Sequence, residues 1–210
     1  MFIGKFDRAI LITFIGTLSV MIGSYFALVE GNITAAIIAL VIAGLTDMFD
    51  GKVARSIKGR TDEDKEYGIQ IDSLADTVAF VVYPIIILYA YLLKYNLDFN
   101  GVLLIMISTL FIACGVTRLA YFNTVANKVD GPVKYYSGMP VTTTAILFPL
   151  AYLFKGLMSV KVFAYVYIAL CIIIPFLFIL NFKLKKPKGK LFYIIVPIIA
   201  LAAITALIIL

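Results

Sequence analysis

Seven apolar segments divide this chain, and their lengths limit the folds that it can adopt. A helix needs about 20 apolar residues to cross a hydrocarbon core about 30 Å thick. Hydrophobic residues make up 63% of the 210 residues, against roughly 45–50% in soluble domains. The sequence therefore predicts an all-α, polytopic transmembrane helix bundle, since a barrel would alternate polar and apolar positions. The segments are Ala9–Val29, Ile33–Phe49, Leu74–Leu93, Val102–Thr117, Met139–Phe154, Val162–Phe182 and Leu191–Leu210.

These segments leave no room for a second large domain, so residues 1–210 are expected to form a single integral-membrane domain. The first segment is too long for a cleavable signal peptide and lacks a small-residue cleavage site. Cys114 and Cys171 lie far apart within apolar segments, which indicates packing residues rather than a zinc site. Histidine is absent, so any metal site must use oxygen ligands.

The distribution of positive charge orients the helices. With the N-terminus in the cytoplasm, 15 of the 18 Lys and Arg residues fall on the cytoplasmic side, and Lys94, Lys155 and Lys161 fall outside. This bias follows the positive-inside rule and predicts seven crossings of the cell membrane with the C-terminus outside. The basic run Lys183–Lys190 is expected to bind anionic lipid head groups.

An acid-rich stretch joins the second and third apolar segments. Asp47 and Asp50 lie three residues apart at the end of one predicted helix, and Asp72 and Asp76 lie four apart at the start of the next. These spacings place each pair on one helix face. An intramembrane carboxylate costs about 2.5–3.5 kcal/mol, so four together require a neutralising partner. The acidic residues between the pairs are expected to form a solvated loop: Asp62, Glu63, Asp64 and Glu66.

Divalent cations are the partners that best suit this cluster. Mg²⁺ and Mn²⁺ bind carboxylate oxygens, water and phosphate, and paired ions clamp a phosphoryl group during displacement. Gly51 and Gly68 lack side chains and would let a diphosphate approach the backbone, while Arg55 would pair with its oxygens. Helix capping is the alternative. It suits Asp72, but not a carboxylate at the C-terminal end of a helix such as Asp50.

The residues together read D-x2-D-G-x2-A-R, then twelve residues, then G-x3-D-x3-D. This pattern resembles the signature of the CDP-alcohol phosphatidyltransferase family. The resemblance implies an enzyme that replaces the CMP of a CDP-linked lipid or alcohol with another alcohol. It also implies a six-helix core in a homodimer, with Leu191–Leu210 as an extra helix. In this chain the segment Ser56–Tyr67 is longer than the corresponding gap of the signature.

The resemblance assigns roles to individual residues. Two divalent cations, Mg²⁺ or Mn²⁺, are expected on the four aspartates, and Asp76 is also the expected general base. The CDP group is expected to contact the remaining residues of the pattern. The metal ligands are Asp47, Asp50, Asp72 and Asp76, and the CDP-binding residues are Gly51, Ala54, Arg55 and Gly68.

A narrower resemblance, to membrane-embedded phosphatidylserine synthases, covers three stretches. They are "IDSLADTVAFVVYP" (Ile71–Pro84), "CGVTRLAYFN" (Cys114–Asn123) and "YYSGMPVTTTA" (Tyr135–Ala145). The implied substrates are CDP-diacylglycerol and L-serine, used at a cytoplasm-facing site among membrane lipids, with no role for nucleic acid.

The acceptor must be held by groups near the aspartates. Arg118 is predicted to bind its carboxylate, with Asn123 and Lys134 as further acceptor-binding residues. Tyr121 stands where these synthases usually have arginine, so other acceptors stay open: glycerol 3-phosphate, inositol phosphate or another alcohol. A membrane cation transporter, with carboxylates that bind ions in transit, is the more remote alternative.

Overall fold

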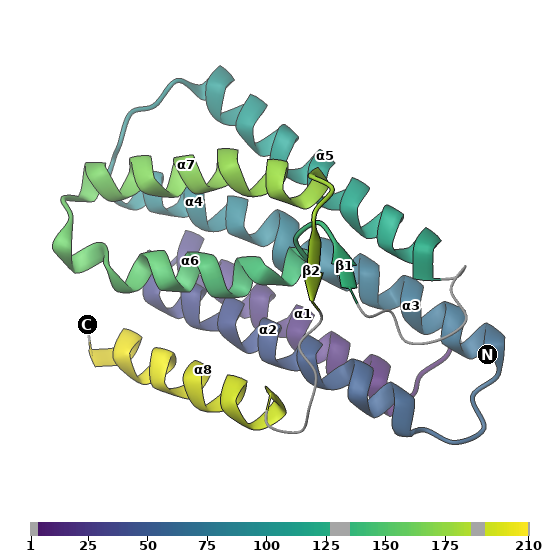
Figure 1. The fold of residues 1–210 in the computed structure, drawn as a ribbon. Coiled ribbons are helices and arrows are strands. Elements are labelled where there is room, and N and C mark those ends of the chain that lie inside the picture. The colour runs from purple at the N-terminus through teal and green to yellow at the C-terminus, as the bar shows by residue number, and fades with distance from the viewer. Residues whose placement is uncertain (1–3, 127–134, 186–191, 210) are drawn as a thin grey trace.

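The computed structural model describes residues 4–126, 135–185 and 192–209. Within these ranges the chain is a bundle of long helices that run side by side (Figure 1). One long helix is continuous from Asp62 to Lys94 and contains a short π-helical segment, η1. The helices are α1 (Arg8–Leu28), α2 (Ile33–Ser56), α3 (Asp62–Asp76), η1 (Thr77–Val82), α4 (Tyr83–Lys94), α5 (Gly101–Ala126), η2 (Val141–Thr143), α6 (Thr144–Leu153), η3 (Lys155–Leu157), α7 (Val160–Ile179) and α8 (Phe192–Ile209).

The helix lengths and compositions fit a multi-pass membrane protein. Among the described residues, 5 helices are long and apolar enough to cross a bilayer: α1, α2, the helix α3–η1–α4, α5 and α7. Two shorter apolar helices, Val141–Leu157 and Tyr193–Ile209, complete the set. The predicted all-α bundle is confirmed. The extra helix, α8, packs against α2 and α6 (Figure 1).

The third long helix begins earlier than the sequence predicted. Thr61 forms a capping box with Asp64: the Asp64 amide donates to Thr61 Oγ1 at 3.1 Å, and the Thr61 amide donates to Asp64 Oδ2 at 2.9 Å. The acidic residues of the first turn also oppose the positive end of the helix dipole. The expectation of a loop over 62–66 was therefore wrong, and Asp72 lies inside a helix rather than at its start.

Pro84 gives the same helix its irregular segment. A proline has no amide hydrogen, so the carbonyl of Phe80 loses its usual donor four residues on. The Thr144 hydroxyl of α6 donates to that carbonyl at 3.1 Å, and the Tyr167 hydroxyl of α7 donates to the Pro84 carbonyl at 3.0 Å. The irregular turn begins directly after Asp76, and α6 supplies a donor to its Phe80 carbonyl.

Small residues let α1 approach α2 closely. A Cβ atom on Gly16 would lie 2.5 Å from Thr46 Oγ1, and one on Gly23 would lie 2.5 Å from the Ala39 Cβ. Glycine and alanine favour such close helix contacts in membranes. The close approach brings the N-terminal half of α1 against the end of α2 that carries the aspartates.

Two short strands, β1 (Tyr135–Ser137) and β2 (Lys183–Lys185), form an antiparallel pair that the sequence did not predict. Gly138 follows β1 with φ +74°, and a Cβ there would lie 2.7 Å from the Phe178 carbonyl oxygen. The Met139 amide donates to the Leu177 carbonyl at 3.0 Å. The segment before α6 is thereby held against the end of α7.

Candidate functional site

Aspartates from two helices meet at one end of the bundle. One carboxylate oxygen from each of Asp47, Asp50 and Asp72 lies within 4.8 Å of the other two. Asp76 lies next to Asp47, and Asp50 lies next to Asp72. Three of the four predicted aspartates therefore share one cluster, and Asp76 borders it beside Asp47.

The donor set suits a hard divalent cation. Asp50 is buried, and Asp72 Oδ1 is buried with no hydrogen-bond partner in the described part of the chain. A buried carboxylate oxygen without a partner is costly unless a cation or a donor reaches it. Mg²⁺ and Mn²⁺ prefer such oxygen ligands, so the residues present fit these ions.

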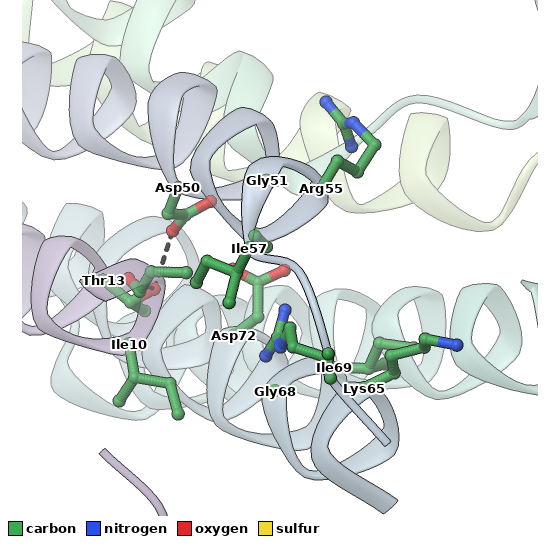
Figure 2. A pocket seen from close by; sticks show the side chains of 14 residues that line it. Ile10, Thr13, Asp50, Gly51, Arg55, Ile57, Lys65, Gly68, Ile69 and Asp72 are labelled. Atoms are coloured by element: carbon green, nitrogen blue, oxygen red, sulfur yellow. Dashed lines mark hydrogen bonds between the residues drawn. The ribbon is translucent and has the colours of Figure 1, made fainter. Parts of the chain in front are cut away.

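Helix α1 also contributes to the cluster. Thr13 Oγ1 donates a 2.8 Å hydrogen bond to Asp50 Oδ2 (Figure 2). Thr13 also lines a small cavity, of about 10 Å³, between α1, α2 and the helix that carries Asp76. The sequence analysis missed Thr13. The feature that could have indicated Thr13 is a hydroxyl side chain within the apolar segment that precedes the aspartate-bearing helix.

A larger cavity opens beside the cluster. Its volume is about 580 Å³, and Figure 2 shows Asp50 and Asp72 on facing sides of it. All four residues predicted to bind CDP line this cavity: Gly51, Ala54, Arg55 and Gly68. Apolar side chains of α1, such as Ile10, complete the lining. The cavity combines carboxylates, cations and exposed backbone, a combination that suits a phosphate ester with bound cations.

An arginine outside the predicted set occupies the space above one glycine. A Cβ on Gly68 would lie 2.7 Å from Nη2 of Arg60, whereas a Cβ on Gly51 would lie 3.4 Å from Nη1 of Arg55. Arg60 also lines the cavity. It comes from the segment Ser56–Tyr67, whose unusual length was its only signal in the sequence.

Arg118 lines a different, second cavity of about 200 Å³. It is buried at 5% exposure, its Nε donates to the Met139 carbonyl at 3.1 Å, and its guanidinium lies over the Phe122 ring at 5.6 Å. Polar side chains share the cavity: Thr117, Tyr121, Ser137 and Asn181. A buried arginine among polar groups can receive a carboxylate or a phosphate.

The other two predicted acceptor residues have different surroundings. The Asn123 side-chain amide exchanges hydrogen bonds with the Ser73 hydroxyl, at 2.8 and 3.1 Å, and so ties α5 to α3 beside Asp72. Lys134 lies outside the described residues. Of the two that lie among the described residues, Arg118 lines the second cavity and Asn123 does not.

The lysines predicted outside gather at the end of the bundle opposite the aspartates. Lys94 and Lys155 both lie against the Tyr95 ring, at 5.2 and 5.6 Å. At the other end, Lys52 lies over the Tyr193 ring at 4.9 Å. Lys94 and Lys155 thus lie at one end of the bundle and Lys52 lies at the other.

The helical bundle and its carboxylate-lined cavity define a multi-pass membrane protein with an acidic cluster that could hold a metal ion. The chain belongs to the CDP-alcohol phosphatidyltransferase family, whose sequence model matches residues 7–208.

Curated relatives match half of the chain or more. An archaetidylserine synthase of Methanothermobacter thermautotrophicus is 32% identical over 145 residues, 69% of this chain and 57% of that protein. A CDP-diacylglycerol–serine O-phosphatidyltransferase of Helicobacter pylori is 41% identical over 109 residues, 51% of this chain and 42% of that protein. One of the same name from Saccharomyces cerevisiae is 39% identical over 112 residues, 50% and 37% of the two chains. The chain spans about half the length of the curated relatives it matches.

Proposed function

We propose that this chain is an enzyme that transfers the phosphatidyl group of CDP-diacylglycerol to L-serine, yielding phosphatidylserine and CMP. The observation that carries the proposal is the cavity that Asp50 and Asp72 line together with the glycines and the arginine of the family pattern, Gly51, Gly68 and Arg55. Serine as the acceptor is supported by relatives whose names all specify a serine product or substrate.

The residues divide the chemistry between them. The serine hydroxyl oxygen attacks the lipid-bearing phosphorus, and the bond from that phosphorus to the oxygen of CMP breaks, so CMP leaves with the electron pair. Asp76 takes the hydroxyl proton. Its place beside Asp47, in the small cavity bounded by Thr13, supports this role. A positioned base contributes about 10²–10⁴-fold to rate.

The four aspartates would hold two divalent cations, Mg²⁺ or Mn²⁺. When bound, these ions offset the charge of the diphosphate and of the attacking oxygen. Thr13 keeps the Asp50 carboxylate oriented, and Gly51 and Ala54 leave room for the nucleotide on α2. Arg55 adds positive charge at the rim of the cavity.

Arg118 is proposed as the carboxylate-binding residue of the acceptor, with Asn123 and Lys134 as further acceptor-binding residues. The burial of Arg118 and its fixed Nε contact support a pre-oriented guanidinium. Glycerol 3-phosphate, inositol phosphate and other alcohols are the alternative acceptors. An archaetidyl lipid linked to CDP is the alternative donor, because one relative is named for that product.

The aspartates are proposed to face the cytoplasm, and the enzyme is proposed to work as a homodimer in the cell membrane. The sorting of lysines between the bundle ends supports this orientation. Accessibility of single cysteines introduced at Lys58 and Lys161 to an impermeant thiol reagent tests it: protection of the first and labelling of the second are expected in intact cells.

Release of CMP by the purified chain tests the activity. The chain is supplied with CDP-diacylglycerol or the archaetidyl analogue, with each acceptor in turn, and with Mg²⁺ or Mn²⁺. CMP formation that requires L-serine is expected. Release with a phosphorylated acceptor alone would reassign the acceptor, and ion flux into liposomes without any CMP would favour transport instead.

A further inference from the structure

Arg60 is a cation of the large cavity that the family pattern does not contain. It lies in the lengthened segment Ser56–Tyr67. Its side chain is only 11% exposed, and its Nη2 atom lies 2.7 Å from the position of a Cβ on Gly68. Gly68 is one helical turn before Asp72, so the guanidinium lies next to the aspartate cluster.

The contacts of Arg60 hold it in place without using all of its donors. Nη2 pairs with Asp7 Oδ2 at 3.0 Å and donates to the Asp64 carbonyl at 3.2 Å. Nε is buried and has no hydrogen-bond partner among the residues that the structure describes. A guanidinium has five N–H donors, so this one keeps capacity for an anion.

The other cations of the cavity are held less firmly. Arg55 and Lys65 are both exposed, and Lys65 pairs with Asp62 at 2.7 Å, away from the aspartate cluster. Exposed cations are screened by water and bind phosphate weakly. Arg60 is therefore the pre-positioned cation on the α3 side of the cavity.

The charges of the aspartates, the metal ions and the diphosphate indicate a role for Arg60. Four aspartates neutralise two divalent cations, which leaves the two negative charges of a bound diphosphate diester to the protein. Arg55 on the α2 side can supply one positive charge, and Arg60 on the α3 side can supply the other. Two arginines on opposite sides of the cavity would also fix the orientation of the diphosphate.

Resting on the function proposed above, we propose that Arg60 is a donor-binding residue that contacts the diphosphate of the CDP-linked lipid. The lengthened segment supplies it, and Asp7 and the α3 N-terminus hold it over Gly68.

A purely structural role for Arg60 makes a different prediction. If Arg60 only joined the N-terminal segment to α3, it would act through its ion pair with Asp7. Loss of either partner would then have the same effect on CDP binding. Asp7→Asn separates the two roles. Asp7 Oδ1 accepts from the amides of Ala9 and Ile10 at 2.9 and 3.0 Å, and asparagine keeps this cap while losing the charge that pairs with Arg60.

The test is calorimetric titration of CDP into the full chain in detergent micelles with Mn²⁺, for the wild type, Arg60→Gln, Arg60→Lys and Asp7→Asn. We expect Arg60→Gln to raise the Kd of CDP by about tenfold, the effect of one lost charge-assisted hydrogen bond. Arg60→Lys should raise it less, because the charge remains but the fork is lost. Asp7→Asn should raise it clearly less than Arg60→Gln, because the guanidinium still donates to the Asp64 carbonyl.

Two results would overturn the inference. An equal rise in the Kd of CDP in Arg60→Gln and Asp7→Asn would show that Arg60 acts only through its ion pair with Asp7. A wild-type Kd in Arg60→Gln would show that Arg60 does not contact the donor. Both results would leave the proposed function standing. Absence of CDP binding by the wild type would instead contradict both the proposed function and this inference.

Discussion

Thr13 of α1 donates a 2.8 Å hydrogen bond to Asp50 of α2 and so joins the first helix to the aspartate cluster. Asp50 is only 5% exposed, so few other donors can reach its carboxylate. The contact makes α1 part of the site, although α1 carries none of the residues of the family pattern.

Replacing Thr13 by valine should weaken metal binding. The change keeps the shape and removes the hydroxyl, which frees Asp50 to rotate away from the geometry of the cluster. We expect the Mn²⁺ concentration for half-maximal activity to rise about tenfold, the equivalent of one hydrogen bond to a charged group. Thr13→Ser, which keeps the hydroxyl, should behave as wild type.

Ser24→Ala is the matched control, because the Ser24 hydroxyl donates only within α1, to the Val20 carbonyl at 2.8 Å. A Thr13→Val enzyme with the metal dependence of Ser24→Ala would show that α1 plays no part in the site.

Asp76→Asn should separate binding from chemistry. Asparagine has nearly the same shape but cannot accept the serine proton, so kcat should fall at least about 10²-fold. The Kd of CDP in the presence of Mn²⁺ should change much less than kcat. A variant with near-normal turnover would remove Asp76 from the role of base.

Thr144→Val should destabilise the fold without affecting chemistry. The Thr144 hydroxyl lies within hydrogen-bond distance of two carbonyls, that of Val141 at 2.9 Å and that of Phe80 at 3.1 Å, and Pro84 removes the usual donor to the Phe80 carbonyl. An interhelical hydrogen bond in a membrane protein contributes about 0.6–2 kcal/mol, so the Tm in detergent should fall measurably. Thr144→Ser should restore the wild-type Tm. An unchanged Tm in the valine variant would show that the Phe80 carbonyl needs no donor.

Arg118 should act on the acceptor alone. Arg118→Gln removes a buried charge from the second cavity, and we expect the KM for serine to rise about tenfold or more while the KM for the CDP-lipid stays constant. Arg118→Lys should not restore the wild-type KM for serine. Lysine lacks the planar group that lies over Phe122 while it donates to the Met139 carbonyl. Equal changes in both KM values would contradict an acceptor role.

The sequence predicted the bundle and the cluster because both depend on local spacing. Apolar segments long enough to cross a membrane form helices, because a helix satisfies the hydrogen bonds of its own backbone. Carboxylates at i, i+3 and i, i+4 lie on one face of such a helix. Asp47 and Asp50 share a face of α2 for that reason, and the fold then adds Asp72 from α3. The start of α3 at Asp62 also depends on local sequence, through the capping box of Thr61 and Asp64. The many charged residues of that segment led instead to the prediction of a loop.

Contacts between distant segments could not be predicted in the same way. The hydrogen bond of Thr13 to Asp50 spans 37 residues of sequence, and that of Asn123 to Ser73 spans 50. The position of Arg60 over Gly68 depends on the path of a loop, and no spacing rule fixes that path. The antiparallel pairing of Tyr136 with Leu184 likewise needs the whole bundle to bring its strands together.

Binding of Mn²⁺, followed by electron paramagnetic resonance with CDP present, tests the central claim most directly. The account predicts two Mn²⁺ ions per chain, spin-coupled at a separation of about 3.5–4 Å as in other two-metal sites. Asp50→Asn and Asp72→Asn should abolish the coupled signal. A chain that binds CDP with no Mn²⁺, or with Mn²⁺ that neither substitution disturbs, would contradict the account.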